Sequence, residues 1–128
     1  MTNPNLLSPS TLAFLGDAVY GLEVRKRLCT VNRPSGTLHS MSVRLVNATA
    51  QAQAFKLIEG LLNEEEMQAF KKGRNMHLSS IPKNSTVGEY HTATGLETLF
   101  GFLFLKQSSD RIEELFSVIW EDFSGNNN

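Results

Sequence analysis

The sequence has 128 residues and is poor in cysteine and in net charge. Its single cysteine, Cys29, excludes an internal disulfide framework and a cysteine-based zinc site, and it is typical of a reducing compartment. The 12 basic and 13 acidic residues give a net charge of -1, which argues against a protein covered in positive charge but allows a local basic patch. No apolar run approaches the roughly 18 residues that a membrane span needs. We therefore expect a cytoplasmic protein that does not enter a membrane.

The overall composition is that of a globular protein. Hydrophobic residues make up 41% of the sequence and charged residues 20%, which excludes a disordered or collagen-like chain. At this length we expect one domain, over residues 1–123, that is large enough to bury a core. The last residues, 124–128, are small and polar, and we expect them to form a disordered tail.

The spacing of the apolar residues predicts five helices and no competing strands, so the fold class is all-α. The first helix is expected to open at Ser8, a good N-cap, with Pro9 at the first helical position, and to run to about Leu28. A second helix is expected over residues 38–55, where apolar side chains recur at alternating gaps of three and four. Gly60 is the expected stop of that helix.

Three further helices are predicted in the second half of the chain. One is expected from Asn63 to Gly73, with acids in its first turn and lysines near its end, as the helix dipole favours. The next is expected from Thr86, which opens a capping-box pattern, to about Lys106. The last is expected to begin near Ser109. The chain therefore predicts a compact helical bundle rather than alternating strands and helices.

Two acids stand in apolar stretches of these predicted helices. Asp17 lies in the run 12–20, next to Gly16, and Glu97 lies in the apolar run 93–101. Neither acid has a basic residue one turn away. Because a carboxylate in apolar surroundings needs a compensating partner, and because a mid-helix glycine is costly, we expect close packing and a buried ionic site around Asp17.

Each acid has more than one interpretation. Asp17 could cap another helix or pair with a distant arginine, and Glu97 could be a solvated glutamate on an exposed face. Alternatively, the two acids could converge on a hard divalent cation such as Mg²⁺, which takes one or two carboxylates, retains waters and bridges to phosphate. That combination suits metal-assisted phosphodiester hydrolysis.

A basic stretch lies between the two helices that follow Asn63. Residues 71–83 contain four lysines and arginines, one histidine and no acid, together with polar side chains that donate to phosphate. Such a loop could grip the backbone of a nucleic acid. The alternative is an ordinary solvated surface loop.

Four short stretches carry a family resemblance. Residues 12–20, with the sequence Leu-Ala-Phe-Leu-Gly-Asp-Ala-Val-Tyr, resemble the signature helix of the ribonuclease III family. Gly73-Arg74-Asn75 and Pro82-Lys83-Asn84 resemble the basic loop of one branch, the Mini-ribonuclease III proteins, which lack a double-stranded-RNA-binding domain. Residues 90–101 resemble the second catalytic helix of that branch. The order and spacing agree over about residues 10–122.

The resemblance implies a homodimer of all-α subunits that cuts double-stranded RNA, leaving a 5′-phosphate and a 3′-hydroxyl. It implies that Asp17 and Glu97 are the catalytic residues and hold Mg²⁺ directly or through water. The implied substrate in the branch is the precursor of large-subunit ribosomal RNA. The expected RNA-binding residues are Lys71, Lys72, Arg74, Asn75, Lys83 and Asn84.

The sequence departs from the wider family at the expected site. Family members place four acids there, but the position four residues before Asp17 is Ala13 and the position three residues before Glu97 is Thr94. Mini-ribonuclease III members lack the same two acids, so the departure is typical of the branch. Fewer anionic ligands predict weak metal affinity and a need for oxygens from water or substrate. In addition, His91 stands where the branch is expected to have an arginine, which affects one phosphate contact.

The missing acids keep a second hypothesis open. Degenerate domains of this kind can be non-catalytic RNA-binding or ribosome-associated proteins, although the presence of both Asp17 and Glu97 argues against that role here. A third hypothesis is a helical interaction module with no role in RNA binding. The candidates for a dimer interface are Phe14, Leu15, Ala18 and Leu22, which could equally belong to the core of a single chain.

Overall fold

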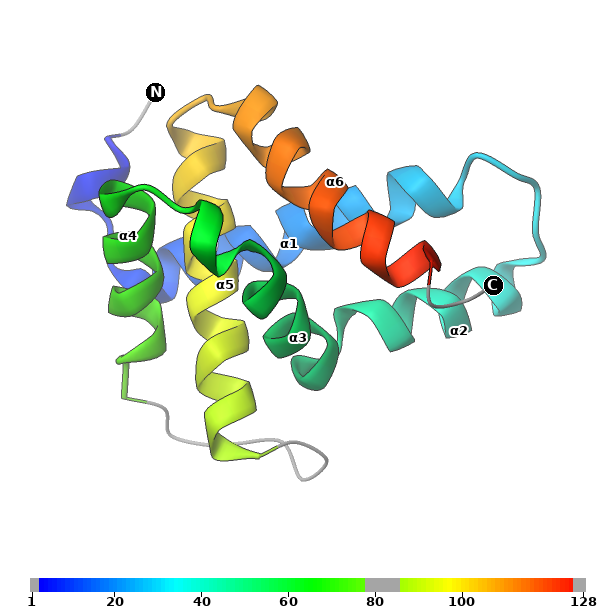
Figure 1. Ribbon diagram of the computed structural model, residues 1–128, viewed down its shortest axis with the longest axis horizontal. Helices are drawn as coiled ribbons and strands as arrows, with labels where there is room; N and C mark the ends of the chain where they lie inside the picture. The colour runs from blue at the N-terminus through cyan, green and yellow to red at the C-terminus, as the bar shows by residue number, and fades with distance from the viewer. Residues whose placement is uncertain (1–2, 78–85, 126–128) are drawn as a thin grey trace.

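The computed structural model describes residues 3–77 and 86–125, and every regular element in these ranges is helical (Figure 1). The prediction of an all-α fold is confirmed. None of the described helices is long and apolar enough to cross a membrane. The elements are η1 (Pro4–Leu6), α1 (Pro9–Leu28), α2 (Ser35–Val46), α3 (Ala48–Ile58), η2 (Glu59–Leu61), α4 (Glu64–Arg74), α5 (Val87–Leu105) and α6 (Ser109–Gly125).

Side-chain caps set several of the helix ends where the sequence predicts them. Ser8 accepts a hydrogen bond from the backbone N–H of Thr11, and α1 covers the predicted range. Capping boxes open both α4 and α5, the latter between Thr86 and Glu89 as predicted. α6 begins at Ser109 and continues to Gly125, so Ser124 is helical, while residues 126–128 lie outside the described residues.

The prediction of one continuous helix over residues 38–55 is wrong. Asn47 has an extended backbone (φ −72°, ψ 165°) and separates α2 from α3. Its side chain accepts from the backbone N–H of Ala50 at 2.8 Å, so it competes with the helical ladder. The apolar spacing continues through the break because side chains of both helices pack against the same core.

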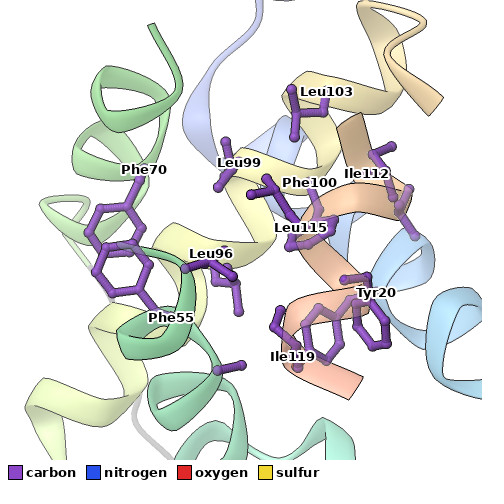
Figure 2. Packing of buried hydrophobic residues seen from close by; sticks show 14 of the residues in the cluster. Tyr20, Phe55, Phe70, Leu96, Leu99, Phe100, Leu103, Ile112, Leu115 and Ile119 are labelled. Carbon is purple, nitrogen blue, oxygen red and sulfur yellow. The ribbon is translucent and has the colours of Figure 1, made fainter. Parts of the chain in front are cut away.

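Helix α5 forms the centre of the bundle and packs against α1, α3, α4 and α6 (Figure 1). Two aromatic groups fill the core on either side of it (Figure 2). Tyr20, Phe100 and Phe116 meet edge to face, and Phe55 stacks on Phe70 with ring centroids 3.7 Å apart. These contacts fix how α1, α3, α4 and α6 lie against α5.

Glycine allows α1 to cross α5 with the two backbones in contact. A Cβ atom at Gly16 would lie 1.6 Å from the carbonyl oxygen of Glu97, and one at Gly101 would lie 2.0 Å from the carbonyl oxygen of Leu12. No other residue fits at these two positions without moving a helix. The close packing that the sequence predicts around Gly16 is therefore present, and it places the residue after Gly16 beside Glu97.

A second glycine pair lies where α4 crosses α5. A Cβ atom at Gly73 would lie 2.1 Å from Oγ1 of Thr98, and one at Gly95 would lie 2.7 Å from the ring of Phe70. Helix α4 continues one residue past Gly73, to Arg74, so the predicted range is confirmed to within one residue. The absence of a side chain at Gly73 also allows α4 to pack closely against α5.

Candidate active site

The crossing of α1 and α5 brings Asp17 and Glu97 together. Their side chains lie close enough for a hydrogen bond between the two carboxyl groups when one of them carries a proton. Asp17 lies on the exposed side of α1, whereas Glu97 is half-buried. The expectation of a buried Asp17 is therefore wrong. Of the two acids, Glu97 is the one shielded from water, because it lies on α5 at the centre of the bundle.

The surroundings of Glu97 favour its protonated form. Burial is the largest cause, and the charge of Asp17 and the hydrogen bond with Asp17 act in the same direction, so that the pKa of Glu97 rises to about 8. A hydrogen bond from Gln51 opposes this rise. Burial, and then the charge of Glu97, raise the pKa of Tyr20, so this core phenol stays neutral. At neutral pH the acid pair holds a proton in a position where a cation could replace it.

Gln51 on α3 is the third polar side chain at this site, and the sequence analysis did not identify it. It is 2% exposed, and its Nε2 lies 3.4 Å from Oε2 of Glu97 and 2.9 Å from the carbonyl oxygen of Val46. An amide within an alanine-rich helix has no motif around it. Only the fold shows that α3 directs this amide at Glu97.

A groove of about 650 Å³ adjoins Glu97. It runs between α5 and the segment that joins α2 to α3, and both Gln51 and the exposed Arg44 line it. Its other polar lining residues are Asn47, Thr49, Gln53, Tyr90 and Thr94. The side chains of Asn47, Thr49 and Thr94 already donate hydrogen bonds within the chain. The exposed side chains of Arg44 and Gln53 can donate to the oxygens of a polar chain that lies in the groove.

The predicted RNA-binding residues are placed only in part. Lys71, Lys72, Arg74 and Asn75 lie together at the end of α4, whereas Lys83 and Asn84 fall outside the described residues. The Arg74 guanidinium lies 5.6 Å from the ring centroid of Phe70 and donates to Asn75. His91 on α5 donates from Nδ1 to the carbonyl oxygen of Arg74 at 2.9 Å, which ties α5 to this end of α4. Among the described residues, none of the four lines the groove beside Glu97.

The four candidates for a dimer interface divide into two groups. Phe14 is 85% exposed, Leu22 is 54% exposed and Ala18 is also exposed, so these three do not belong to the core of the chain. Their spacing of four residues places them on one side of α1. Leu15 is half-buried and packs against the core instead. An exposed apolar strip therefore lies next to Asp17.

The positions that lack acids are occupied by small buried side chains. Ala13 is buried, and so is Thr94, whose hydroxyl donates to the carbonyl oxygen of Tyr90 at 3.0 Å. Within residues 3–77 and 86–125, no group of three or more histidine, cysteine, aspartate or glutamate side chains could hold a metal ion. Asp17 and Glu97 are thus the two carboxyl groups that the crossing of α1 and α5 brings together.

Comparisons with known proteins agree with this fold. A family model described as the ribonuclease III domain matches residues 10–108. The chain is 42% identical over 113 residues to the Mini-ribonuclease 3 of a Thermoanaerobacter species, with 88% of this chain and 80% of the relative covered. It is 36% identical over 115 residues to the Mini-ribonuclease 3 of Clostridium tetani, with 88% and 76% covered. A crystal structure of a protein from Fusobacterium nucleatum matches with a TM-score of 0.86 at 30% identity, covering 95% of this chain and 98% of that one.

Proposed function

This chain belongs to the ribonuclease III family, and we propose that it is a metal-dependent endoribonuclease that hydrolyses double-stranded RNA. The observation that carries the proposal is the pairing of Asp17 and Glu97 at the crossing of α1 and α5. The products that we propose are a 5′-phosphate and a 3′-hydroxyl, and the proposed natural substrate is the precursor of large-subunit ribosomal RNA. That substrate rests on the resemblance to the Mini-ribonuclease III branch.

The acid pair has the donor set that suits Mg²⁺. Asp17 and Glu97 present only carboxylate oxygens, they lie within hydrogen-bonding distance of each other, and Asp17 is open to solvent. Two carboxylates leave most of an octahedral shell to water and substrate oxygens, as Mg²⁺ prefers. When bound, Mg²⁺ would activate water for attack and offset the charge that develops on the scissile phosphate.

The residues around the pair would serve to hold it and to admit the RNA. The backbone contact at Gly16 fixes how far Asp17 can lie from Glu97, and Gln51 donates to the Glu97 carboxylate. The groove beside Glu97 gives one RNA strand a polar path to the site, with Arg44 available to a phosphate. We propose that Lys71, Lys72, Arg74 and Asn75, with Lys83 and Asn84, hold the RNA backbone through charge and hydrogen bonds.

We propose that the active form is a homodimer. The exposed strip of Phe14, Ala18 and Leu22 would be buried against a second copy of the chain, since an apolar face of this kind is unfavourable in water. A twofold dimer suits an antiparallel RNA duplex, because each site then meets one strand in the same way. Asp17 would lie at the edge of this interface.

A second candidate function is non-catalytic RNA binding. The observation that favours it is the presence of Ala13 and Thr94 where the wider family has acids. The retained pair of Asp17 and Glu97 favours the nuclease. The two functions differ in one outcome, because only the nuclease cuts RNA when a divalent cation is added.

Cleavage of a long double-stranded RNA tests the proposal. We expect the protein to cut the RNA with Mg²⁺ and to stop when EDTA is added. The variant Glu97→Gln keeps the shape of the side chain and removes its charge, so cleavage should slow by at least about a hundredfold. The variant Glu121→Gln is the control, because it makes the same change at an exposed position of α6 outside the groove.

Two outcomes would contradict the nuclease proposal. Equal cleavage by the wild type and Glu97→Gln would mean that the activity belongs to another site or to another protein. Binding of the duplex without cleavage at any Mg²⁺ concentration would favour the non-catalytic function instead.

A further inference from the structure

We propose that Gln51 is a positioning residue whose side-chain amide holds the Glu97 carboxylate in the orientation in which it faces Asp17. The proposal rests on the proposed nuclease function and adds to it a residue that comes from a third helix. Gln51 does not touch the reacting atoms in this proposal, because it acts through Glu97.

The burial of Gln51 is the first observation. The side chain is 2% exposed, although its neighbours on α3 at positions 48, 50, 52 and 54 are alanines. Glutamine is rarely fully buried, and buried amides normally have hydrogen-bond partners. The partners of this amide should therefore show what its burial achieves.

The hydrogen bonds fix the orientation of the amide. Nε2 lies within reach of two oxygen atoms, the carbonyl of Val46 at 2.9 Å and Oε2 of Glu97 at 3.4 Å. Both are acceptors when Glu97 is ionised, so each takes one of the two amide hydrogens, and a flipped amide would place oxygen against oxygen. Within the described part of the chain, Oε1 is buried and has no partner. The two bonds from Nε2 are therefore the polar contacts that hold this side chain.

The break between α2 and α3 creates the anchor for Gln51. In a continuous helix the carbonyl of Val46 would accept from the backbone N–H of Ala50. Here the side chain of Asn47 takes that N–H, at 2.8 Å, and leaves the carbonyl of Val46 to Gln51. The amide of Gln51 thus joins the end of α2 to the acid on α5.

A donor at Oε2 has a defined effect on Glu97. The last torsion of a glutamate side chain is broad, so a carboxylate that has only solvent around it rotates freely. The amide of Gln51 restrains that rotation and directs the remaining lone pairs of Glu97 toward Asp17. Outer-shell donors of this kind orient carboxylate ligands at metal sites.

The variant Gln51→Met tests the proposal, with Gln68→Met as a matched control. Gln68 is an exposed glutamine of α4 that does not line the groove, whereas Gln51 is buried and donates to Glu97. For Gln51→Met we expect kcat on duplex RNA to fall about tenfold, KM to change by less than about twofold, and the Mg²⁺ concentration for half-maximal cleavage to rise about tenfold. Gln68→Met should leave kcat and the Mg²⁺ requirement unchanged.

A second measurement uses the wild-type chain without RNA and needs no Gln51 variant. Nuclear magnetic resonance of the side-chain amides, with Mg²⁺ alone as the probe, should show the Gln51 signals shifting as Mg²⁺ is added while the Gln68 signals stay in place. The same titration of Glu97→Gln should leave the Gln51 signals unmoved. A role that is only structural would not make the amide signals of Gln51 depend on both Mg²⁺ and Glu97.

The outcomes separate this proposal from the proposed function. Wild-type cleavage together with unchanged kcat and Mg²⁺ requirement in Gln51→Met would overturn the role of Gln51 and leave the nuclease intact. The role of Gln51 would also be overturned if Mg²⁺ activates wild-type cleavage but the Gln51 signals do not shift. This outcome holds even if Gln51→Met fails to fold. Absence of cleavage by the wild type would overturn the nuclease function and, with it, the role of Gln51.

Discussion

Helix α5 crosses both α1 and α4 at glycine residues. The two crossings differ in which atoms of the neighbouring helix lie opposite those glycines, and at what distance. At the α1 crossing, Gly16 and Gly101 face backbone atoms of the other helix, at 1.6 and 2.0 Å from where a Cβ atom would lie. At the α4 crossing the nearest atoms belong to the side chains of Thr98 and Phe70, and the backbone of the other helix lies farther away, at 3.0 Å from a Cβ atom at Gly73 and 2.8 Å from one at Gly95. The backbones are therefore closer at the α1 crossing, which makes it the less adjustable of the two.

The two acids lie at the less adjustable crossing. In the proposed nuclease, a metal site with only two carboxylates would depend strongly on the distance between them, and the backbone contact at Gly16 restricts that distance. The α4 crossing instead orients the end of α4, where Lys71, Lys72 and Arg74 lie. Contacts with an RNA backbone tolerate more movement than metal coordination does, because long basic side chains reach over several ångströms.

Gly16→Ala should give the largest effect. The added Cβ atom would lie 1.6 Å from the carbonyl oxygen of Glu97, so α1 must move away and Asp17 must leave Glu97. We expect cleavage to fall at least about a hundredfold and the free energy of unfolding to fall by about 3 kcal/mol. Urea unfolding measures the loss of stability. A cleavage assay, at a temperature where the variant is folded, measures the loss of activity.

Gly88→Ala is the control for Gly16→Ala. A Cβ atom at Gly88, in the first turn of α5, meets nothing within 4 Å, and we expect no loss of stability or activity. If folded Gly16→Ala cuts RNA as fast as Gly88→Ala, the backbone contact does not set the geometry of the acids.

Gly73→Ala should give a smaller effect of a different kind. The new Cβ atom would lie 2.1 Å from Oγ1 and 2.6 Å from Cβ of Thr98. Rotation of Thr98 moves Oγ1 but not Cβ, so α4 must also shift slightly, and the Thr98 hydroxyl would lose its 2.8 Å hydrogen bond to the carbonyl oxygen of Thr94. We expect the free energy of unfolding to fall by about 2 kcal/mol. Because the acid pair is not at this crossing, kcat of the folded variant should stay within about threefold of the wild type. An equal loss of kcat in Gly73→Ala and Gly16→Ala would abolish the distinction between the two crossings.

The pH dependence of stability should give the smallest effect and reports on Glu97 alone. Its pKa is raised from 4.5 to about 8 in the folded protein. Between these values the unfolded chain loses the proton and the folded protein keeps it, so stability without metal should fall as pH rises from about 4.5 to 8. Glu97→Gln cannot ionise, and it should therefore be more stable than the wild type at pH 8.5, by at least about 1 kcal/mol.

Urea unfolding in EDTA at pH 5 and pH 8.5 measures this difference. Glu121→Gln is again the control, since it changes the same charge on an exposed surface of α6. A stability difference between wild type and Glu97→Gln that is the same at both pH values would show that Glu97 has an ordinary pKa in the folded protein.

Local rules predict much of this fold but little of the contact between its helices. The start of α1 and the capping box of α5 follow from Ser8, Thr86 and Glu89, because a cap depends on residues within one turn. The apolar surroundings of Asp17 and Glu97 also identify both acids from the sequence. That Asp17 is exposed while Glu97 is half-buried depends on which face of each helix meets the other, and the spacing within one helix does not determine this.

The break at Asn47 and the contact of Gln51 with Glu97 are two features of the site that the sequence pattern does not predict. Apolar side chains of α2 and α3 keep a helical spacing across Asn47, since both helices pack against the same core, so the periodic pattern hides the break. Gln51 has no partner within its own helix segment that would mark it. Its contact with Glu97 joins residues 46 positions apart, and only the packed fold brings them together.

The position of α2 has a consequence for how the groove behaves over time. Helix α5 is packed on several sides, so its amides exchange hydrogen only when most of the bundle opens, whereas α2 packs chiefly against α1 and α3 and extends from the side of the bundle (Figure 1). Local opening of α2 therefore requires far less free energy than opening of α5. The groove beside Glu97 thus has one wall, α5, that keeps its shape and another, α2, that opens more readily. Because the carbonyl oxygen of Val46 at the end of α2 accepts from Gln51, we expect local opening of α2 to release that amide and to change the orientation of Glu97.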